Sequence, residues 1–164
     1  YNPTPDFSYG LNIYLEYKNF DLTMFWQGVQ GVDVISDLKK ETDLWSGLNI
    51  GFLNKGKRVL DAWSPTNPNS TIPALSRSDT NNEKRVSTYF VENGSFLKLR
   101  NIQLGYNVPK NFAQKMKMER LRFYLSAQNV FTIKSKEFTG VDPENANYGY
   151  PIPMNITFGI NVGF

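Results

Sequence analysis

The sequence contains no cysteine and no histidine. Zinc sites built on those ligands, thiol nucleophiles and every catalytic arrangement that uses an imidazole are therefore excluded for this chain. No stretch approaches the roughly 20 consecutive apolar residues of a transmembrane helix, so a helical membrane protein is excluded as well. Lysines and arginines form no long run and the net charge is only +3, so we expect no nucleic-acid partner.

The first residues have none of the features of a signal peptide. The chain begins Tyr-Asn-Pro, without an initiating methionine, a basic segment or an apolar segment. A strand-like pattern follows almost at once, from Tyr9 onward. We therefore expect the sequence to be an interior piece of a longer polypeptide.

What the sequence does contain is a high share of aromatic residues and a regular alternation of side chains. Aromatics make up 15%, while the mean hydropathy is −0.43. From Met154 to Phe164, every even position is apolar and every odd position is polar or glycine. This period of two predicts a strand with one apolar face. A strand that crosses a bilayer at a tilt needs about 9–11 residues, which this stretch provides.

The same alternation recurs upstream, and it predicts five strands separated by short and long connections in turn. Short connections on one side of the membrane and long loops on the other are typical of an outer-membrane barrel. The long connections also contain helix-like spacings. The predicted strands cover about residues 8–17, 20–31, 96–108, 121–132 and 153–164; the long connections cover 32–95 and 133–153; helical turns are predicted within 34–45, 57–63 and 111–117.

Alternation alone fits a soluble β-sandwich as well as a barrel. Aromatic residues near the ends of the first hairpin, such as Tyr9 and Trp26, favour a barrel because such rings gather at membrane interfaces. Phe164 completes the alternation of the last strand and resembles the assembly signal of outer-membrane proteins. We predict an all-β fold, a transmembrane antiparallel β-barrel, of which this chain supplies five strands. Five strands cannot close a barrel, since bacterial ones begin at about eight.

Three motifs lie in order along residues 86–164. Residues 91–106 read VENGSFLKLRNIQLGY, residues 121–132 read LRFYLSAQNVFT, and residues 140–144 read GVDPE, followed by Tyr150-Pro151. Together they closely resemble the C-terminal region of SusC/RagA-like TonB-dependent transporters. Residues 1–85 would be a preceding hairpin and a variable loop.

This resemblance implies the C-terminal part of a barrel of about 22 strands in the outer membrane of a Gram-negative, Bacteroidetes-type bacterium. The N-terminal plug and the other strands would lie outside this sequence. Such a transporter imports oligosaccharides, or sometimes peptides, with energy delivered through TonB. Its implied partners are a SusD-like surface lipoprotein, outer-membrane lipid and a second transporter–lipoprotein pair. No cofactor, no metal site and no enzymatic activity are expected.

The long connection is the candidate substrate-binding region. Its aromatic rings would stack on sugar rings while nearby polar groups bind hydroxyls, or the rings would simply pack the loop on itself. The candidates are Trp45, Trp63, Tyr89, Phe90, Asp61 and Asn67.

Polar residues on the strands would face the barrel interior, where they line the transport path or contact the plug; these are Glu16, Asp21, Arg122 and Gln128. Asp142 and Glu144 would either bind a cation or form a proline-containing turn, and we favour the turn. Cations near the outer rim would pair with lipopolysaccharide phosphates or stay solvated; these are Lys98, Arg100, Lys134 and Lys136.

Three rival functions remain open. The same transporter type could import peptides. A passive porin would need a complete barrel without a plug. A soluble carbohydrate-binding β-sandwich would fold alone in water, whereas a barrel segment would aggregate without detergent or partners.

Overall fold

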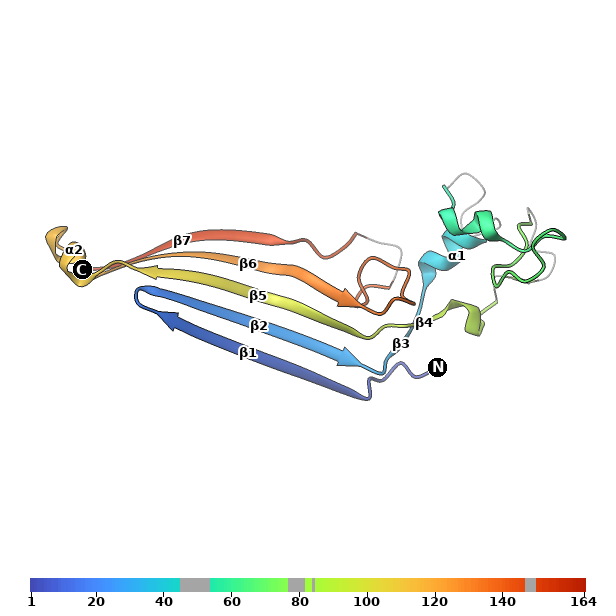
Figure 1. Cartoon of the computed structure of the whole chain (residues 1–164), viewed down its shortest axis with the longest axis horizontal. Coiled ribbons are helices and arrows are strands. Elements are labelled where there is room, and N and C mark those ends of the chain that lie inside the picture. Colours follow the sequence, from blue (N-terminus) through green and yellow to red (C-terminus); the bar gives the residue numbers. More distant parts are fainter. Residues whose placement is uncertain (45–53, 77–81, 84, 147–149) are drawn as a thin grey trace.

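The computed structural model describes residues 1–44, 54–76, 82–83, 85–146 and 150–164. It shows one elongated five-stranded antiparallel sheet with a layer of loops and short helices at one end (Figure 1). The predicted strand ranges differ from the observed ones by at most two residues. In spatial order the strands are β1 (Phe7–Tyr17), β2 (Phe20–Gln30), β5 (Phe96–Asn107), β6 (Arg120–Lys134) and β7 (Asn155–Gly163).

The sheet is an up-and-down meander in which each strand pairs with its neighbours in chain order. A two-residue turn joins β1 to β2, with Tyr17 opposite Phe20 and Lys18 in the left-handed region at φ 55°. Turns with positive φ suit tight hairpins because their twist matches that of the strands. The long connection then separates β2 from β5, yet these two strands are direct neighbours.

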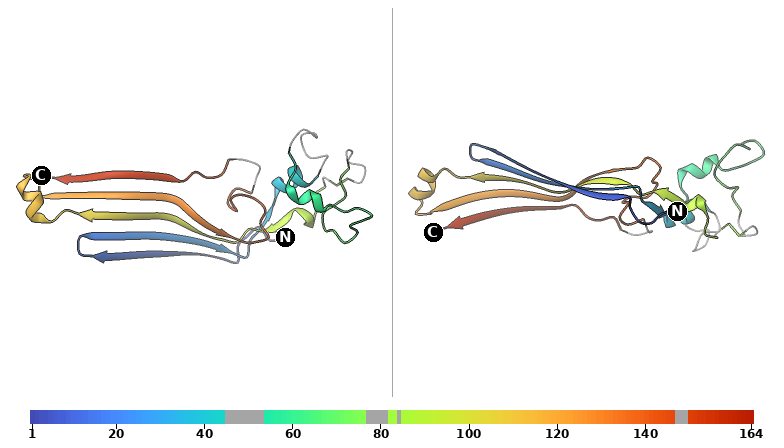
Figure 2. Two further views of the ribbon diagram at one scale, coloured as in Figure 1. Left: turned by 45° about the horizontal axis from the view of Figure 1, so that its top comes forward. Right: turned by 90° about the horizontal axis from the view of Figure 1, so that it is seen from below.

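A bulge interrupts the ladder toward the loop end. The pairing between β5 and β6 steps from Leu99–Phe131 to Asn101–Gln128, so Arg100 has no register partner, and Asn129 has a φ of 54°. Bulges of this kind increase the local twist and change the direction of side chains. Figure 2 shows the resulting twist of the sheet along its length.

One face of the sheet carries the apolar positions of every strand, and these side chains remain exposed. The exposed fraction of Phe158, in the middle of β7, is 65%. A sandwich requires a second sheet over this face, and the described strands form only the five-stranded sheet and a two-stranded one in the loop layer. The sandwich alternative is therefore wrong for the described residues. Other exposed members of the apolar face are Leu11, Leu15, Leu104, Leu125, Ile156, Ile160 and Val162.

The loop layer is built from the long connection. Its two ends pair as β3 (Asp33–Ile35) and β4 (Val91–Asn93), two short strands that the sequence did not predict. Between them, in the described part of the connection, lie α1 (Asp37–Asp43) and the 3-10 helices η1 (Lys57–Asp61) and η2 (Thr88–Phe90). The helical turns predicted within 34–45 and 57–63 correspond to α1 and η1.

The opposite end of the sheet carries α2 (Lys110–Lys115), which corresponds to the helical turn predicted within 111–117. The C-terminus lies beside α2, and the N-terminus lies near the loop layer (Figure 1). Across the described residues, no helix has the length and apolar character needed to span a membrane.

Candidate functional site in the loop layer

The motif Glu92-Asn93-Gly94-Ser95 closes the base of the loop layer. The Ser95 hydroxyl accepts a hydrogen bond from the Gly31 backbone N–H at 3.1 Å, and the Gly94 N–H donates to the Val32 carbonyl at 2.8 Å. A Cβ on Gly94 would lie 2.7 Å from a methyl carbon of Val34, so only glycine fits there without displacement. The motif thus joins the first and last residues of the long connection.

Glu92 is buried and connects three segments. Its carboxylate accepts hydrogen bonds from the Thr139 backbone N–H at 2.9 Å and from the Thr139 hydroxyl at 2.8 Å. Lys39 of α1 places its Nζ 3.4 Å from the same carboxylate and also donates to the Tyr89 carbonyl at 2.8 Å. A buried carboxylate is stable only when it is hydrogen-bonded and its charge is compensated, and both conditions are met here.

Lys98 forms a second buried ionic cluster, on the inner face of the sheet. The exposed fraction of Lys98 is 1%, and its Nζ donates to both carboxylate oxygens of Asp142, at 3.0 and 2.8 Å. The same Nζ lies 2.5 Å from Glu144. Arg100 pairs with Glu144 and donates from Nε to the Gln27 side chain at 2.7 Å.

This cluster corrects the prediction that Lys98 and Arg100 meet lipopolysaccharide or solvent. Lys98 pairs in register with Gln27, an inner-face residue, so its side chain points away from the exposed apolar face. Lys134 donates to the carbonyl of Gly140 and is likewise engaged within the chain. Lys136 is exposed.

Asp142 and Glu144 lie in a turn, which agrees with the preferred alternative for this motif. The Glu144 N–H donates to the Asp142 side chain at 3.0 Å, and the Asn145 N–H donates to the Asp142 carbonyl at 3.0 Å. The two carboxylates are neutralised by Lys98 and Arg100. Within the part of the chain that the structure describes, no three or more aspartate or glutamate side chains are grouped so that they could hold a metal ion, and the sequence has no histidine or cysteine.

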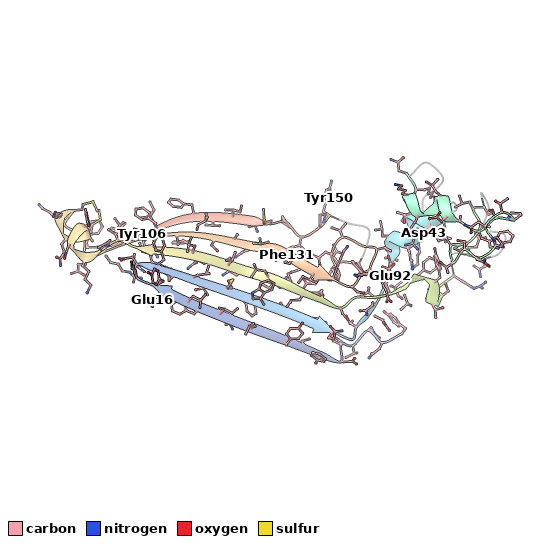
Figure 3. The ribbon with its side chains drawn as sticks, in the orientation of Figure 1. Glu16, Asp43, Glu92, Tyr106, Phe131 and Tyr150 are labelled. Carbon is pink, nitrogen blue, oxygen red and sulfur yellow. The ribbon has the colours of Figure 1, made fainter. Side chains whose placement is uncertain are left out.

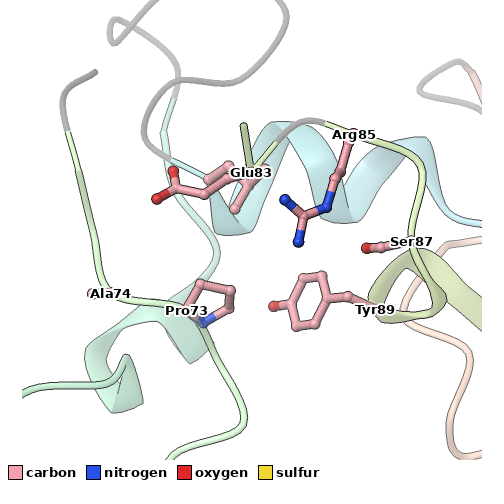
Figure 4. A pocket seen from close by; sticks show the side chains of 7 residues that line it. Pro73, Ala74, Glu83, Arg85, Ser87 and Tyr89 are labelled. Carbon is pink, nitrogen blue, oxygen red and sulfur yellow. The ribbon is translucent and has the colours of Figure 1, made fainter. Parts of the chain in front are cut away.

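A cavity of about 360 Å³ opens in the loop layer beside Tyr89 (Figure 4). The Tyr89 hydroxyl donates to the buried Asp43 carboxylate at 2.7 Å, and Arg58 lies 3.1 Å from the same carboxylate. Burial, followed by the hydrogen bond to Asp43, raises the pKa of Tyr89 well above its ordinary value. The remaining walls of the cavity are formed by Leu44, Pro73, Ala74, Glu83, Arg85 and Ser87.

The residues predicted to stack on sugar rings have different environments in the structure. The exposed fraction of Phe90 is 1%, so its ring packs inside the loop layer and cannot face a substrate. Trp63 has an exposed fraction of 45%, and Tyr89 lines the cavity. The side-chain amide of Asn67 donates to the Asp61 backbone carbonyl at 3.1 Å, which makes it part of a local turn. Trp45 lies outside the described residues.

The predicted inner-face residues fall into two groups. Asp21 and Arg122 form an ion pair at 2.5 Å, over Gly105, where a Cβ would lie 2.4 Å from the Asp21 carboxylate. Glu16 pairs with Asp21 in register and lies near the hairpin end of the sheet (Figure 3). Gln128 is opposite Asn101 and Asn155, well along β6 from this pair. Phe164 follows β7 and is exposed.

The sequence alone did not indicate the two networks that hold the loop layer together. These are Glu92, Lys39 and Thr139 in one network, and the pairing of Lys98 with Asp142 in the other. One local signal was available, because Lys98 alternates with Leu97 and Leu99. The bulge at Arg100 reverses the phase relative to Ile102 and Leu104, so strict alternation along the whole strand would have placed Lys98 on the outer face. The partners could not be found in the same way, since they are more than 40 residues away.

No protein-family model matches the chain. The TonB-dependent receptor P3 of Formosa agariphila is 34% identical over 99% of the chain, which spans 17% of that relative. The TonB-dependent receptor P26 of the same organism is 33% identical, again over 99% of the chain and 17% of the relative. The TonB-dependent receptor SusC of Bacteroides thetaiotaomicron is 31% identical over 99% of the chain and 15% of the relative.

Solved structures of the RagAB peptide importer share the fold. In the open-open state the TM-score is 0.80 at 28% identity, over 98% of this chain and 17% of that one. The chain therefore spans about one sixth of the proteins that it resembles. Its sheet is a segment of an antiparallel transporter barrel. Since both sequence and structure agree over nearly the whole length, the chain belongs to the SusC/RagA-like family of TonB-dependent receptors.

Proposed function

We propose that the chain is part of an outer-membrane importer that uses TonB-derived energy to take up oligosaccharides together with a SusD-like surface lipoprotein. The observation that carries this proposal is the sheet itself, whose outer face is apolar and exposed while its inner face carries paired charges. Strands with this division suit a wall between lipid and a wet interior. The similarity of the chain to TonB-dependent receptors supports the proposal that uptake uses TonB-derived energy.

The oligosaccharide assignment rests on the loop layer. Trp63 is exposed, and the half-buried Tyr89 lines the cavity of this layer together with Ser87, which adds a hydroxyl to the same wall. Aromatic rings bind apolar faces of a ligand, and nearby polar groups fix its orientation. A peptide is the second candidate, because the solved structures with the same fold belong to a peptide importer.

A binding experiment separates the two substrates. The full-length transporter, purified with its lipoprotein, would be titrated calorimetrically with neutral oligosaccharides and with mixed peptides of similar mass. We expect heat of binding from the oligosaccharides only. The Trp63→Ala variant should weaken that binding about tenfold, which corresponds to about 1.4 kcal/mol, whereas Leu60→Ala, at another exposed loop position, should not. If only the peptides bound saturably, the proposed substrate would be a peptide and not an oligosaccharide.

Energy dependence distinguishes an importer from a porin. We expect uptake by whole cells to stop when TonB is deleted, while surface binding of the substrate persists. Uptake that continues at the same rate without TonB would indicate passive diffusion through an open barrel.

The inner-face pair Asp21–Arg122 is proposed to contact the plug. Its ionic groups lie on the inner side of the sheet, near the end that carries the short turns. Cross-linking of cysteines placed at Thr23 and along the plug of the full-length protein tests this contact. The assembly itself is proposed to be a dimer of transporter–lipoprotein pairs, and native mass spectrometry measures its stoichiometry directly.

A further inference from the structure

The segment 135–146, between β6 and β7, begins at Ser135, whose backbone N–H donates to the Ser95 carbonyl at 3.1 Å. Beyond Ser135 it makes two sets of contacts that involve side chains of the rest of the molecule. Toward its beginning, Thr139 meets the long connection, and toward its end, Asp142 and Glu144 meet the inner face of β5. Directly before Thr139, the ring of Phe138 is buried. The segment therefore spans the space between two regions that are more than 40 residues away from it in sequence.

The Thr139 contact holds the long connection at the point where α1 and β4 meet. Thr139 donates both its backbone N–H and its hydroxyl to Glu92 of β4. Its hydroxyl also lies 3.5 Å from the hydroxyl of Ser36. Ser36 is the N-cap of α1, because its hydroxyl accepts the Lys39 N–H at 3.3 Å. One threonine thus contacts both β4 and the N-cap of α1.

The Asp142–Glu144 contact fixes the other part of the segment to the barrel wall. Lys98 is almost completely buried and binds both carboxylates, so removal of either partner would leave a charge without compensation. The Asp142 turn also orients Glu144 toward Arg100. This contact is ionic and buried, which makes it much less sensitive to screening by salt than a surface pair.

We propose that residues 135–146 are a brace that fixes the tilt of the long connection relative to the barrel wall, with Glu92 and Lys98 as its two positioning residues. In the importer proposed above, on which this role rests, the brace keeps the loop layer in a fixed orientation toward the surface partner. In the described residues, the long connection is attached to the sheet at its base, through the motif of Glu92 to Ser95. The brace joins this base, at Glu92, and the N-cap of α1, at Ser36, to the inner face of β5 at Lys98.

If residues 135–146 act as a brace, both of its contacts must be intact for the long connection to be held. Two independent contacts would each hold the connection separately. Releasing either end abolishes the restraint on the long connection, so releasing the second end has no further effect on it. The test therefore compares Glu92→Gln, Lys98→Met and the double variant in the full-length transporter. Lys136→Met, an exposed lysine in the same segment, is the matched control.

Hydrogen–deuterium exchange, followed by mass spectrometry of peptides that cover residues 33–43, reads out the restraint. We expect Lys98→Met to speed exchange in these peptides about tenfold, although Lys98 contacts none of them. Glu92→Gln should speed exchange at least as much, because it also weakens the pair with Lys39 of α1. The double variant should show no more exchange than Glu92→Gln alone, and Lys98→Arg should preserve much of the protection. Peptides from the β5–β6 pairing and the Lys136→Met control should exchange as in the wild type.

Two results would overturn the brace. One is a change confined to residues 139–146 in Lys98→Met, which would mean that the restraint does not reach the long connection. The other is an additive effect in the double variant, which would mean that the two contacts act independently. Because exchange is measured without substrate, the outcome is separate from that of the oligosaccharide and TonB experiments.

Discussion

The sheet and the loop layer of this chain reverse the usual distribution of polar and apolar groups. On the sheet, large apolar side chains such as Phe158 and Leu125 are exposed, and the ion pair Asp21–Arg122 lies on the protected inner face. In the loop layer, Glu92 and Asp43 are buried and hydrogen-bonded. The hydrophobic effect thus places the sheet in lipid, whereas directional polar contacts determine the shape of the loop layer.

The difference also concerns how each region tolerates change. An apolar surface in lipid is non-directional, so one apolar residue can replace another with little cost. A buried carboxylate depends on particular partners, and loss of one partner leaves it unsatisfied. We therefore expect the sheet to be sensitive to charge and the loop layer to be sensitive to individual hydrogen bonds.

The largest effect is expected from a charge on the outer face. Phe158→Arg should destabilise the full-length barrel by about 2–4 kcal/mol, the cost of arginine near the middle of a bilayer. The neighbouring Thr157→Arg, on the inner face, is the control and should have a much smaller effect. Urea titration of the protein in phospholipid vesicles measures both. Equal destabilisation by the two variants would contradict the assignment of the faces.

The next effect concerns the space above Gly105 on the inner face. Gly105→Ala would place a Cβ 2.4 Å from the Asp21 carboxylate and 2.5 Å from the Arg122 guanidinium, so the ion pair must move. We expect a loss of about 1–3 kcal/mol, as is typical of overpacking. Gly163→Ala is the control, because its nearest neighbour would lie at 3.5 Å. The same urea titration applies, and an unchanged midpoint for Gly105→Ala would count against this packing.

In the loop layer, Tyr89→Phe removes the hydrogen bond to Asp43 and should cost about 1 kcal/mol locally. The pKa of Tyr89 is raised above its ordinary value of 10.0 in the folded state. The folded state therefore holds this proton more tightly than the unfolded state, and the stabilisation is present below pH 10 and lost as the pH rises above it. Limited proteolysis of the loop layer between pH 8 and pH 11 should show increasing cleavage in the wild type. A pH dependence that persists unchanged in Tyr89→Phe would assign the effect to another group.

The smallest effect is expected at the N-terminus of α1. Ser36→Ala removes the cap on the Lys39 N–H and should cost about 0.5–1 kcal/mol. Ser36→Asp restores an acceptor at the same place, but it adds a charge near Glu92, so it should recover only part of the loss. Exchange rates of the α1 amides measure both variants. If Ser36→Ala leaves those rates unchanged, the cap contributes nothing to the helix.

The strands were predictable because each carries its own signal. In β7, the alternation from Ile156 to Val162 predicts both the strand and which of its faces is apolar, and it does so without information from any other segment. The bulge at Arg100 and Asn129 was not predictable, because it depends on how two strands with different residue counts are matched. The short strands β3 and β4 were not predictable from the sequence for a related reason. Each is only three residues long, and each exists only because the other is beside it.

The candidate site shows the same limit more strongly. The stacking role predicted for Phe90 is wrong, because the ring is buried among residues of the loop layer that no local pattern brings together. The turn at Asp142 was foreseen from its own residues, and the structure agrees. Its binding to Lys98 was not foreseen, since that contact joins positions 44 residues apart.

By itself, the sequence determined the strands, their apolar face, the order of short and long connections and the resemblance to a transporter family. These properties follow from periodicity and local motifs, which act over a few residues. Only the tertiary structure decided which charges are buried together and which aromatic rings stay accessible. Ionic contacts such as Lys98–Asp142 and Glu92–Thr139 need two distant segments at hydrogen-bond distance, and the positions of those segments are set by the assembled sheet.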